Sequence, residues 1–77
     1  MSHGYSQSLV QANKEASARL LGVALGRHCI KRGISVSDIA ERFGVSRMTV
    51  YTWFKGMRNP GPAAAIQIQR YLKKSRT

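Results

Sequence analysis

The sequence predicts an all-α fold, a compact bundle of four or five helices that contains a helix-turn-helix. Three observations lead to this prediction. Apolar residues recur at the three- and four-residue spacing of helices that bury one face. Gly33 and Gly44 follow two of these segments, where a left-handed residue often ends a helix. Ser46 and Pro62 stand where two segments begin, and both residue types favour a helix start. The 77 residues provide for one domain with a small core.

The first part of the chain is expected to be a flexible arm followed by a long helix. Residues 1–8 are small and polar, which favours an arm without fixed structure. A helix is predicted to start near Leu9 or Asn13 and to end at Arg32. The residues that form its apolar face at helical spacing are Leu21, Ala24, Leu25 and His28, and the face is broadened by Leu20, Val23 and Ile30.

Small and chemically versatile residues within this helix are predicted to have structural roles. Gly22 and Gly26 lie four residues apart and are interpreted as positions where another helix packs closely. Cys29 is the single cysteine and lies among apolar residues, so we expect a buried thiol. His28 has no neighbours at metal-ligand spacing, so we expect a partly buried helix residue and no metal site.

Two short helices are predicted next in the chain. Either Ser35 or Ser37 caps the first of them, which ends at Phe43 before Gly44. Ser46 caps the second, over residues 47–54.

A last helix is predicted after a loop that contains two prolines. Pro62 is well placed as its first residue, and residues 63–74 continue it. Residues 75–77 are expected to be a basic tail, so the folded domain spans residues 9–74.

The spacing within residues 36–55 predicts that the two short helices form a helix-turn-helix. Ala40 is the fifth of these twenty positions, where two crossing helices leave room for a small side chain only. Gly44 is the ninth, where the chain turns with a positive φ angle. The positions expected to face inward are Ile39, Phe43, Val45, Val50 and Trp53. Trp53 fits this core better than a platform on which single-stranded bases stack.

The exposed side of the second helix is predicted to enter the major groove of DNA. Arg47 has the side chain for paired hydrogen bonds to guanine, and Met48 and Thr52 offer contact to a thymine methyl group. Thr49 and Tyr51 are within reach of a phosphate or a base edge, while residues at helix starts, helix ends and the following loop bind phosphates. The candidate DNA-binding residues are Ser37, Ser46, Arg47, Met48, Thr49, Tyr51, Thr52, Lys55, Arg58 and Asn59.

The charge of the chain is strongly positive. Thirteen Lys and Arg residues face three acidic residues, which gives a formal net charge of +10. DNA phosphates, an acidic protein or an anionic membrane would each attract such a chain, and solubility alone is the simplest interpretation. The cations outside the predicted interface are interpreted mainly as solvated charge: Arg27, Lys31, Arg70, Lys73 and Lys74.

The chain resembles the helix-turn-helix family of the lambda-type repressors and Cro. Residues 33–46 and 50–60 carry the resemblance, including the pattern Trp53-x-x-Gly56-x-x-x-Pro60. The resemblance implies a bundle of four or five helices and a sequence-specific regulator that binds operator DNA as a dimer. Family members often carry Arg near the place of Cys29 and Gln near that of Val36, so one contact to DNA is expected to be missing.

The leading hypothesis is a small phage-type transcriptional repressor that binds a near-palindromic site in double-stranded DNA as a homodimer. It needs no cofactor, metal, membrane or small-molecule ligand, and works in the cytoplasm of a bacterium or an infected host cell. The alternative is an adaptor that targets a recombinase, a transposase or a phage DNA-packaging complex to DNA. Residues 45–51 are similar to recombinase-type helix-turn-helices. No pattern of catalytic residues is recognised, so we expect no enzyme.

Overall fold

Five helices account for most of residues 6–76, which are the residues that the computed structural model describes. No strand occurs among these residues, so the predicted all-α fold is confirmed. The helices are α1 (Gln7–Glu15), α2 (Leu21–Arg32), α3 (Val36–Phe43), α4 (Arg47–Phe54) and α5 (Pro62–Arg76).

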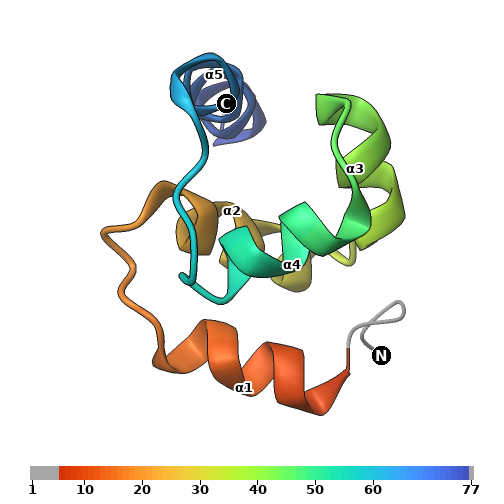
Figure 1. The fold of residues 1–77 in the computed structure, drawn as a ribbon, viewed down its shortest axis with the longest axis vertical. Helices are drawn as coiled ribbons and strands as arrows, with labels where there is room; N and C mark the ends of the chain where they lie inside the picture. Colours follow the sequence, from red (N-terminus) through yellow and green to blue (C-terminus); the bar gives the residue numbers. More distant parts are fainter. Residues whose placement is uncertain (1–5, 77) are drawn as a thin grey trace.

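Helix α4 lies at the centre of the arrangement (Figure 1). It packs against α2, α3 and α1, and α2 packs in turn against α5 and α1. In the view of Figure 1, α1 runs along the bottom, α5 lies at the top, and α3 rises beside the start of α4. Helix α4 is therefore held from three directions, and its remaining side is open.

The prediction of one helix from Leu9 or Asn13 to Arg32 is wrong, because two helices occupy this segment. The chain leaves the helical conformation at Ala16, which has φ −77° and ψ 161°. In the following loop the Ser17 hydroxyl accepts a hydrogen bond from the backbone N–H of Arg19, at 3.3 Å. The break turns α1 back across α2 and α4, which buries Leu9 and Asn13. One continuous helix would carry both side chains away from the core.

Helix α1 also begins earlier than predicted. The Ser6 hydroxyl caps it by accepting a hydrogen bond from the backbone N–H of Leu9, at 3.1 Å. Residues 6–8 of the predicted arm thus belong to this helix and its cap, while residues 1–5 lie outside the described residues. At the other end of the chain, α5 continues through residues 75 and 76 of the predicted tail, and Thr77 lies outside the described residues.

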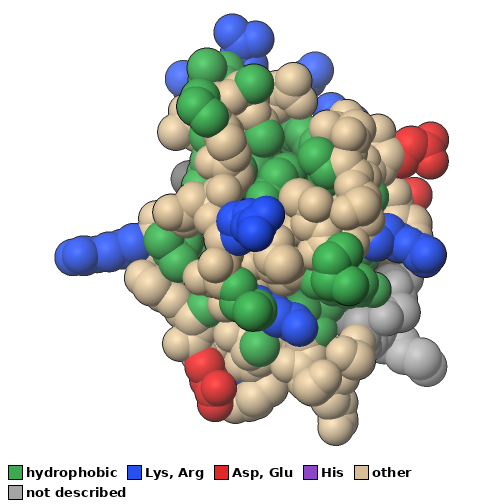
Figure 2. Space-filling view, viewed as in Figure 1, with side chains coloured by type: hydrophobic (Ala, Val, Ile, Leu, Met, Phe, Trp, Pro, Cys, Tyr) green, Lys and Arg blue, Asp and Glu red, His purple; other side chains and the backbone are tan. Residues whose placement is uncertain are grey.

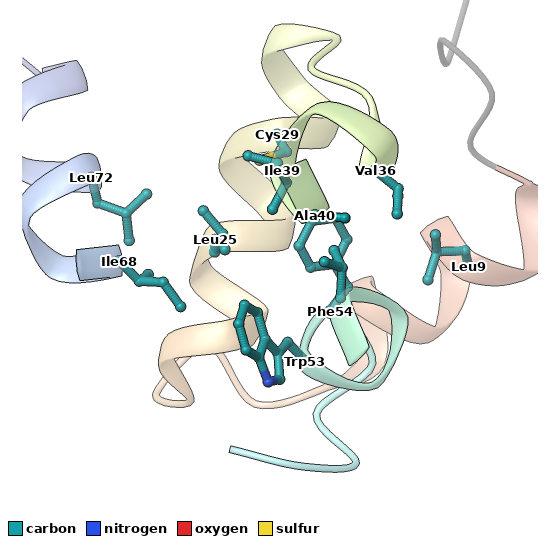
Figure 3. Packing of buried hydrophobic residues seen from close by; sticks show 11 residues of the cluster. Leu9, Leu25, Cys29, Val36, Ile39, Ala40, Trp53, Phe54, Ile68 and Leu72 are labelled. Atoms are coloured by element: carbon teal, nitrogen blue, oxygen red, sulfur yellow. The ribbon is translucent and has the colours of Figure 1, made fainter. Parts of the chain in front are cut away.

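Side chains from all five helices meet in one hydrophobic core (Figure 3). Its buried members are Leu9, Leu25, Cys29, Val36, Ile39, Ala40, Val50, Trp53, Phe54, Ile68 and Leu72. Cys29 is fully buried, as predicted, and burial raises the pKa of its thiol to about 12. The thiol is therefore uncharged at neutral pH and contributes as a small apolar group.

The apolar face predicted for the long helix lies on α2, and the prediction is only partly right. Leu25 is buried, and so is Val23, which was predicted to broaden the face. Leu21, Ala24 and His28 are half-buried. Helix α2 has three helical neighbours and therefore buries more than one face. A single apolar stripe cannot describe such a helix.

The two glycines of α2 allow the close packing that was predicted. A Cβ atom on Gly22 would lie 2.7 Å from Cβ of Trp53, and one on Gly26 would lie 2.8 Å from Cγ of Phe54. Side chains at these positions would push α4 away from α2. The sequence of α2 thus helps to set the position of α4.

Candidate nucleic-acid interface

The predicted helix-turn-helix is formed by α3, a short turn and α4. Ser35, rather than Ser37, caps α3 by accepting a hydrogen bond from the backbone N–H of Asp38 at 3.1 Å. Gly44 ends α3 with a φ angle of 67°, a conformation that other residues rarely adopt. The backbone N–H of Val45 then donates to the carbonyl of Ala40 at 2.9 Å, which closes the helix end.

The inner side of α4 is locked into the core. Val50 and Trp53 are buried, as predicted, and so is Phe54. The rings of Phe43 and Trp53 meet edge to face with centroids 6.5 Å apart, which connects the end of α3 to α4. Because these buried side chains fix it, α4 presents a defined outer side.

Ala40 is buried in the crossing of α3 and α4, with 6% of its surface exposed. We expect Ala40→Leu to lower the free energy of unfolding by about 1–3 kcal/mol, because the added carbons have no space between the helices. Urea denaturation measures this, with Ala63→Leu on the exposed start of α5 as the control. Equal stability of the two variants would contradict the close crossing.

The outer side of α4 carries the predicted DNA-reading residues. Arg47 is exposed in the first turn, and Met48 beside it has 70% of its surface exposed although it is apolar. Thr49, Tyr51 and Thr52 are half-buried. The first turn of α4 therefore protrudes most, which is the part of a recognition helix that contacts base edges.

Local hydrogen bonds occupy three hydroxyl groups along α4. The Ser46 hydroxyl caps the helix, accepting from the backbone N–H of Thr49 at 3.1 Å, and lies 3.0 Å from the Thr49 hydroxyl. The Thr52 hydroxyl donates to the Thr49 carbonyl at 2.6 Å. Because that proton is used within the helix, Thr52 offers DNA its methyl group and an acceptor oxygen.

The predicted phosphate-binding residues lie before and after this helix along the chain. Ser37 is exposed in the first turn of α3. Lys55 is exposed at the end of α4, and Arg58 and Asn59 are exposed in the loop that leads to α5. Four groups that donate hydrogen bonds are thus distributed before and after α4 along the chain, as expected for contacts to a DNA backbone.

Sequence reasoning missed that the start of α1 lies beside the end of α4. Ser6, Ser8 and Leu9 line a small groove of about 190 Å³ together with Tyr51 and Lys55. The capping pattern of Ser6 three residues before Leu9 could have indicated a helix start there. It could not have indicated which part of the chain this helix would approach.

Positive side chains lie over the open side of α4 (Figure 2). In this view, with α4 in front, the acidic side chains appear only at two edges. This face therefore carries positive charge, which attracts the negatively charged phosphates of DNA. Among the described residues, no group of three or more His, Cys, Asp or Glu could hold a metal ion. No helix in this part of the chain has the length and apolar character needed to cross a membrane.

Comparison with protein families gives a match over most of this structure. A family model described as homeodomain-like domain matches residues 15–66. The chain belongs to the homeodomain-like domain family. This family match includes α2, α3 and α4 and supports a DNA-binding helix-turn-helix domain. Comparisons with curated proteins and with solved structures gave no match.

The homeodomain-like match refines the resemblance drawn from the sequence. It supports the helix-turn-helix class and not the narrower lambda-repressor and Cro group. It starts at Glu15, the last residue of α1, and ends within α5. Most of α1, which packs against the candidate recognition helix, therefore lies before the matched residues.

Proposed function

We propose that this protein binds double-stranded DNA sequence-specifically through α4 and represses transcription where it binds. One observation carries the proposal: the inner side of α4 is fixed in the core by Trp53 and Phe54, while Arg47 and Met48 protrude on the other side. A rigid helix with an exposed arginine in its first turn suits insertion into the major groove.

The ten candidate residues divide by the kind of contact that we propose. Arg47 reads a guanine, and Met48 and Thr52 contact thymine methyl groups. Thr49 and Tyr51 bind a phosphate or a base edge. Contacts to the DNA backbone come from Ser37, Ser46, Lys55, Arg58 and Asn59.

The finer proposal is a small, Cro-like homodimer on a near-palindromic operator in the cytoplasm. Two copies of α4 would read two half-sites about 34 Å apart, one turn of the duplex. A bound dimer that overlaps a promoter excludes polymerase without any cofactor. The pattern Trp53-x-x-Gly56-x-x-x-Pro60 supports this version of the proposal.

The second candidate function is an adaptor that brings a recombinase, a transposase or a packaging complex to DNA. The similarity of residues 45–51 to recombinase-type sequences favours it. A symmetric bound site supports the dimeric regulator, and a single asymmetric site supports the adaptor. Both functions require the same reading helix.

The test of DNA reading is Arg47→Ala, measured on a duplex selected for tight binding and on a random duplex. We expect the affinity for the selected duplex to fall about tenfold or more and that for the random duplex about threefold or less. Arg19→Ala, which removes an exposed arginine from the α1–α2 loop, is the control and should preserve the ratio. If Arg47→Ala lowered the affinity for both duplexes equally, Arg47 would contact a phosphate and would not read a base.

A further inference from the structure

A second basic surface lies between the end of α3 and the middle of α5. It is a groove of about 580 Å³, which we call the α3–α5 groove. The residues that line it are Arg42, Phe43, Gln67, Arg70, Tyr71 and Lys74. It combines three cationic side chains with two aromatic rings, and among the described residues no carboxylate lines it.

Contacts on several sides fix the aromatic part of the groove. The ring of Tyr71 meets the rings of Phe43 and His28 edge to face, with centroids 5.8 Å and 5.7 Å away. The Arg42 guanidinium carbon lies 4.7 Å from the centroid of the same ring. Tyr71 is half-buried, so it presents part of a pre-arranged apolar surface to solvent.

The rim of the groove is positively charged and accessible. Arg42 and Arg70 are both exposed, one on α3 and the other on α5. Burial raises the pKa of Tyr71, and the nearby charges of Arg42 and Arg32 oppose part of this rise. In Figure 2, hydrophobic atoms are visible in the hollow between α5 and α3.

We propose that the α3–α5 groove binds an acidic peptide segment of another protein, with an apolar side chain on Phe43 and Tyr71 and carboxylates on Arg42 and Arg70. Arginine pairs with carboxylates through two parallel hydrogen bonds, and amphipathic helices dock in grooves of this kind. A second copy of this chain fits poorly, because each copy has net charge +10 and three acidic residues.

The lining of the groove favours a peptide over DNA as its occupant. Ser37, the candidate phosphate contact on α3, lies in the first turn, whereas Arg42 lies in the last turn. Phe43 contacts Trp53, which is on the buried side of α4. The groove is lined by none of the ten candidate DNA-binding residues, and its ring-lined floor suits an apolar side chain, which a phosphate backbone lacks. The inference does not depend on what α4 reads.

The test uses a fluorescein-labelled peptide of about 12 residues, with a Leu-Phe pair flanked by glutamates, followed by fluorescence anisotropy. We expect the double variant Arg42→Gln, Arg70→Gln to bind it about tenfold more weakly than the unchanged chain. Arg47→Gln with Arg58→Gln removes two exposed charges from the DNA side and should leave binding within about twofold.

Two further measurements separate a groove from general charge attraction. A peptide of equal charge with Ser in place of Leu and Phe should bind about tenfold more weakly. Amide NMR shifts on adding the first peptide should occur at Phe43 and Tyr71 and not along α4. Equal binding of the two peptides, equal losses in the two double variants, or shifts along α4 would each overturn the proposal. A fourth outcome would also overturn it. If the Arg42→Gln, Arg70→Gln variant kept its affinity for the peptide but lost affinity for a random duplex, the groove would belong to the DNA-binding surface.

Discussion

Replacing Asn13 with aspartate is expected to lower the free energy of unfolding by about 3 kcal/mol or more at neutral pH. The Asn13 side-chain amide is buried and donates hydrogen bonds to the carbonyls of Phe54, at 2.7 Å, and Val23, at 3.2 Å. It therefore joins α1 to both α2 and the end of α4. An aspartate of the same shape would direct negative oxygen atoms at these two carbonyls.

The pH dependence of this variant identifies the cause of its instability. Burial and the two carbonyls raise the pKa of an aspartate at position 13 in the folded state above its unfolded value of about 3.9. The folded state then binds more protons than the unfolded state between these two values, so stability falls as pH rises through that window. We expect urea denaturation to show a clear gain in relative stability on acidification.

Asn59→Asp is the matched control, because Asn59 is exposed in the loop before α5. It should change the free energy of unfolding by about 0.5 kcal/mol or less at all pH values tested. If Asn13→Asp matched this control at neutral pH, Asn13 would not be the buried connection between α1 and α4.

Replacing Gly22 with alanine is expected to lower the free energy of unfolding by about 2 kcal/mol, although alanine favours helix by about 1 kcal/mol. The new Cβ atom would lie 2.7 Å from Cβ and 2.8 Å from the carbonyl oxygen of Trp53. No side-chain rotation relieves contact with a backbone atom, so α4 must move away from α2. We also expect affinity for a selected DNA site to fall more than affinity for random DNA.

Gly61→Ala provides a matched control for Gly22→Ala. A Cβ atom at Gly61 would meet nothing within 4 Å, so this variant should be as stable as the unchanged chain or slightly more stable. Thermal unfolding followed by circular dichroism compares the two. A Gly22→Ala variant that unfolds at the same temperature as Gly61→Ala would show that α2 and α4 do not require this close approach.

The helix-turn-helix could be predicted from sequence because short-range chemistry specifies it. Gly44 supplies a left-handed helix end and Ser46 supplies a cap, and Ala40, six positions before that cap, leaves room for the two helices to cross. The outward position of Arg47 follows from the burial of Val50 and Trp53 on the same short helix. These features depend on spacing within twenty residues, so a single sequence reveals them.

The break between α1 and α2 could not be predicted in the same way, because distant contacts cause it. Asn13 is polar and does not mark a buried face in a hydrophobic pattern, yet its partners are ten and forty-one residues away. Phe54 directly follows Trp53, and a helix with one buried face would not bury both. Helix α4 buries both because it has helical neighbours on three sides. The α3–α5 groove likewise depends on how α5 is placed on α2.

The most direct test of DNA reading by α4 is selection of bound sites from a pool of random duplexes, carried out in parallel with the unchanged chain and Arg47→Ala. We predict an enriched sequence motif that contains a guanine, and loss of preference at that base pair alone in Arg47→Ala. Two inverted copies of the motif would support the homodimeric repressor. The absence of any enriched motif, or an identical motif from both proteins, would contradict sequence reading by Arg47 on α4.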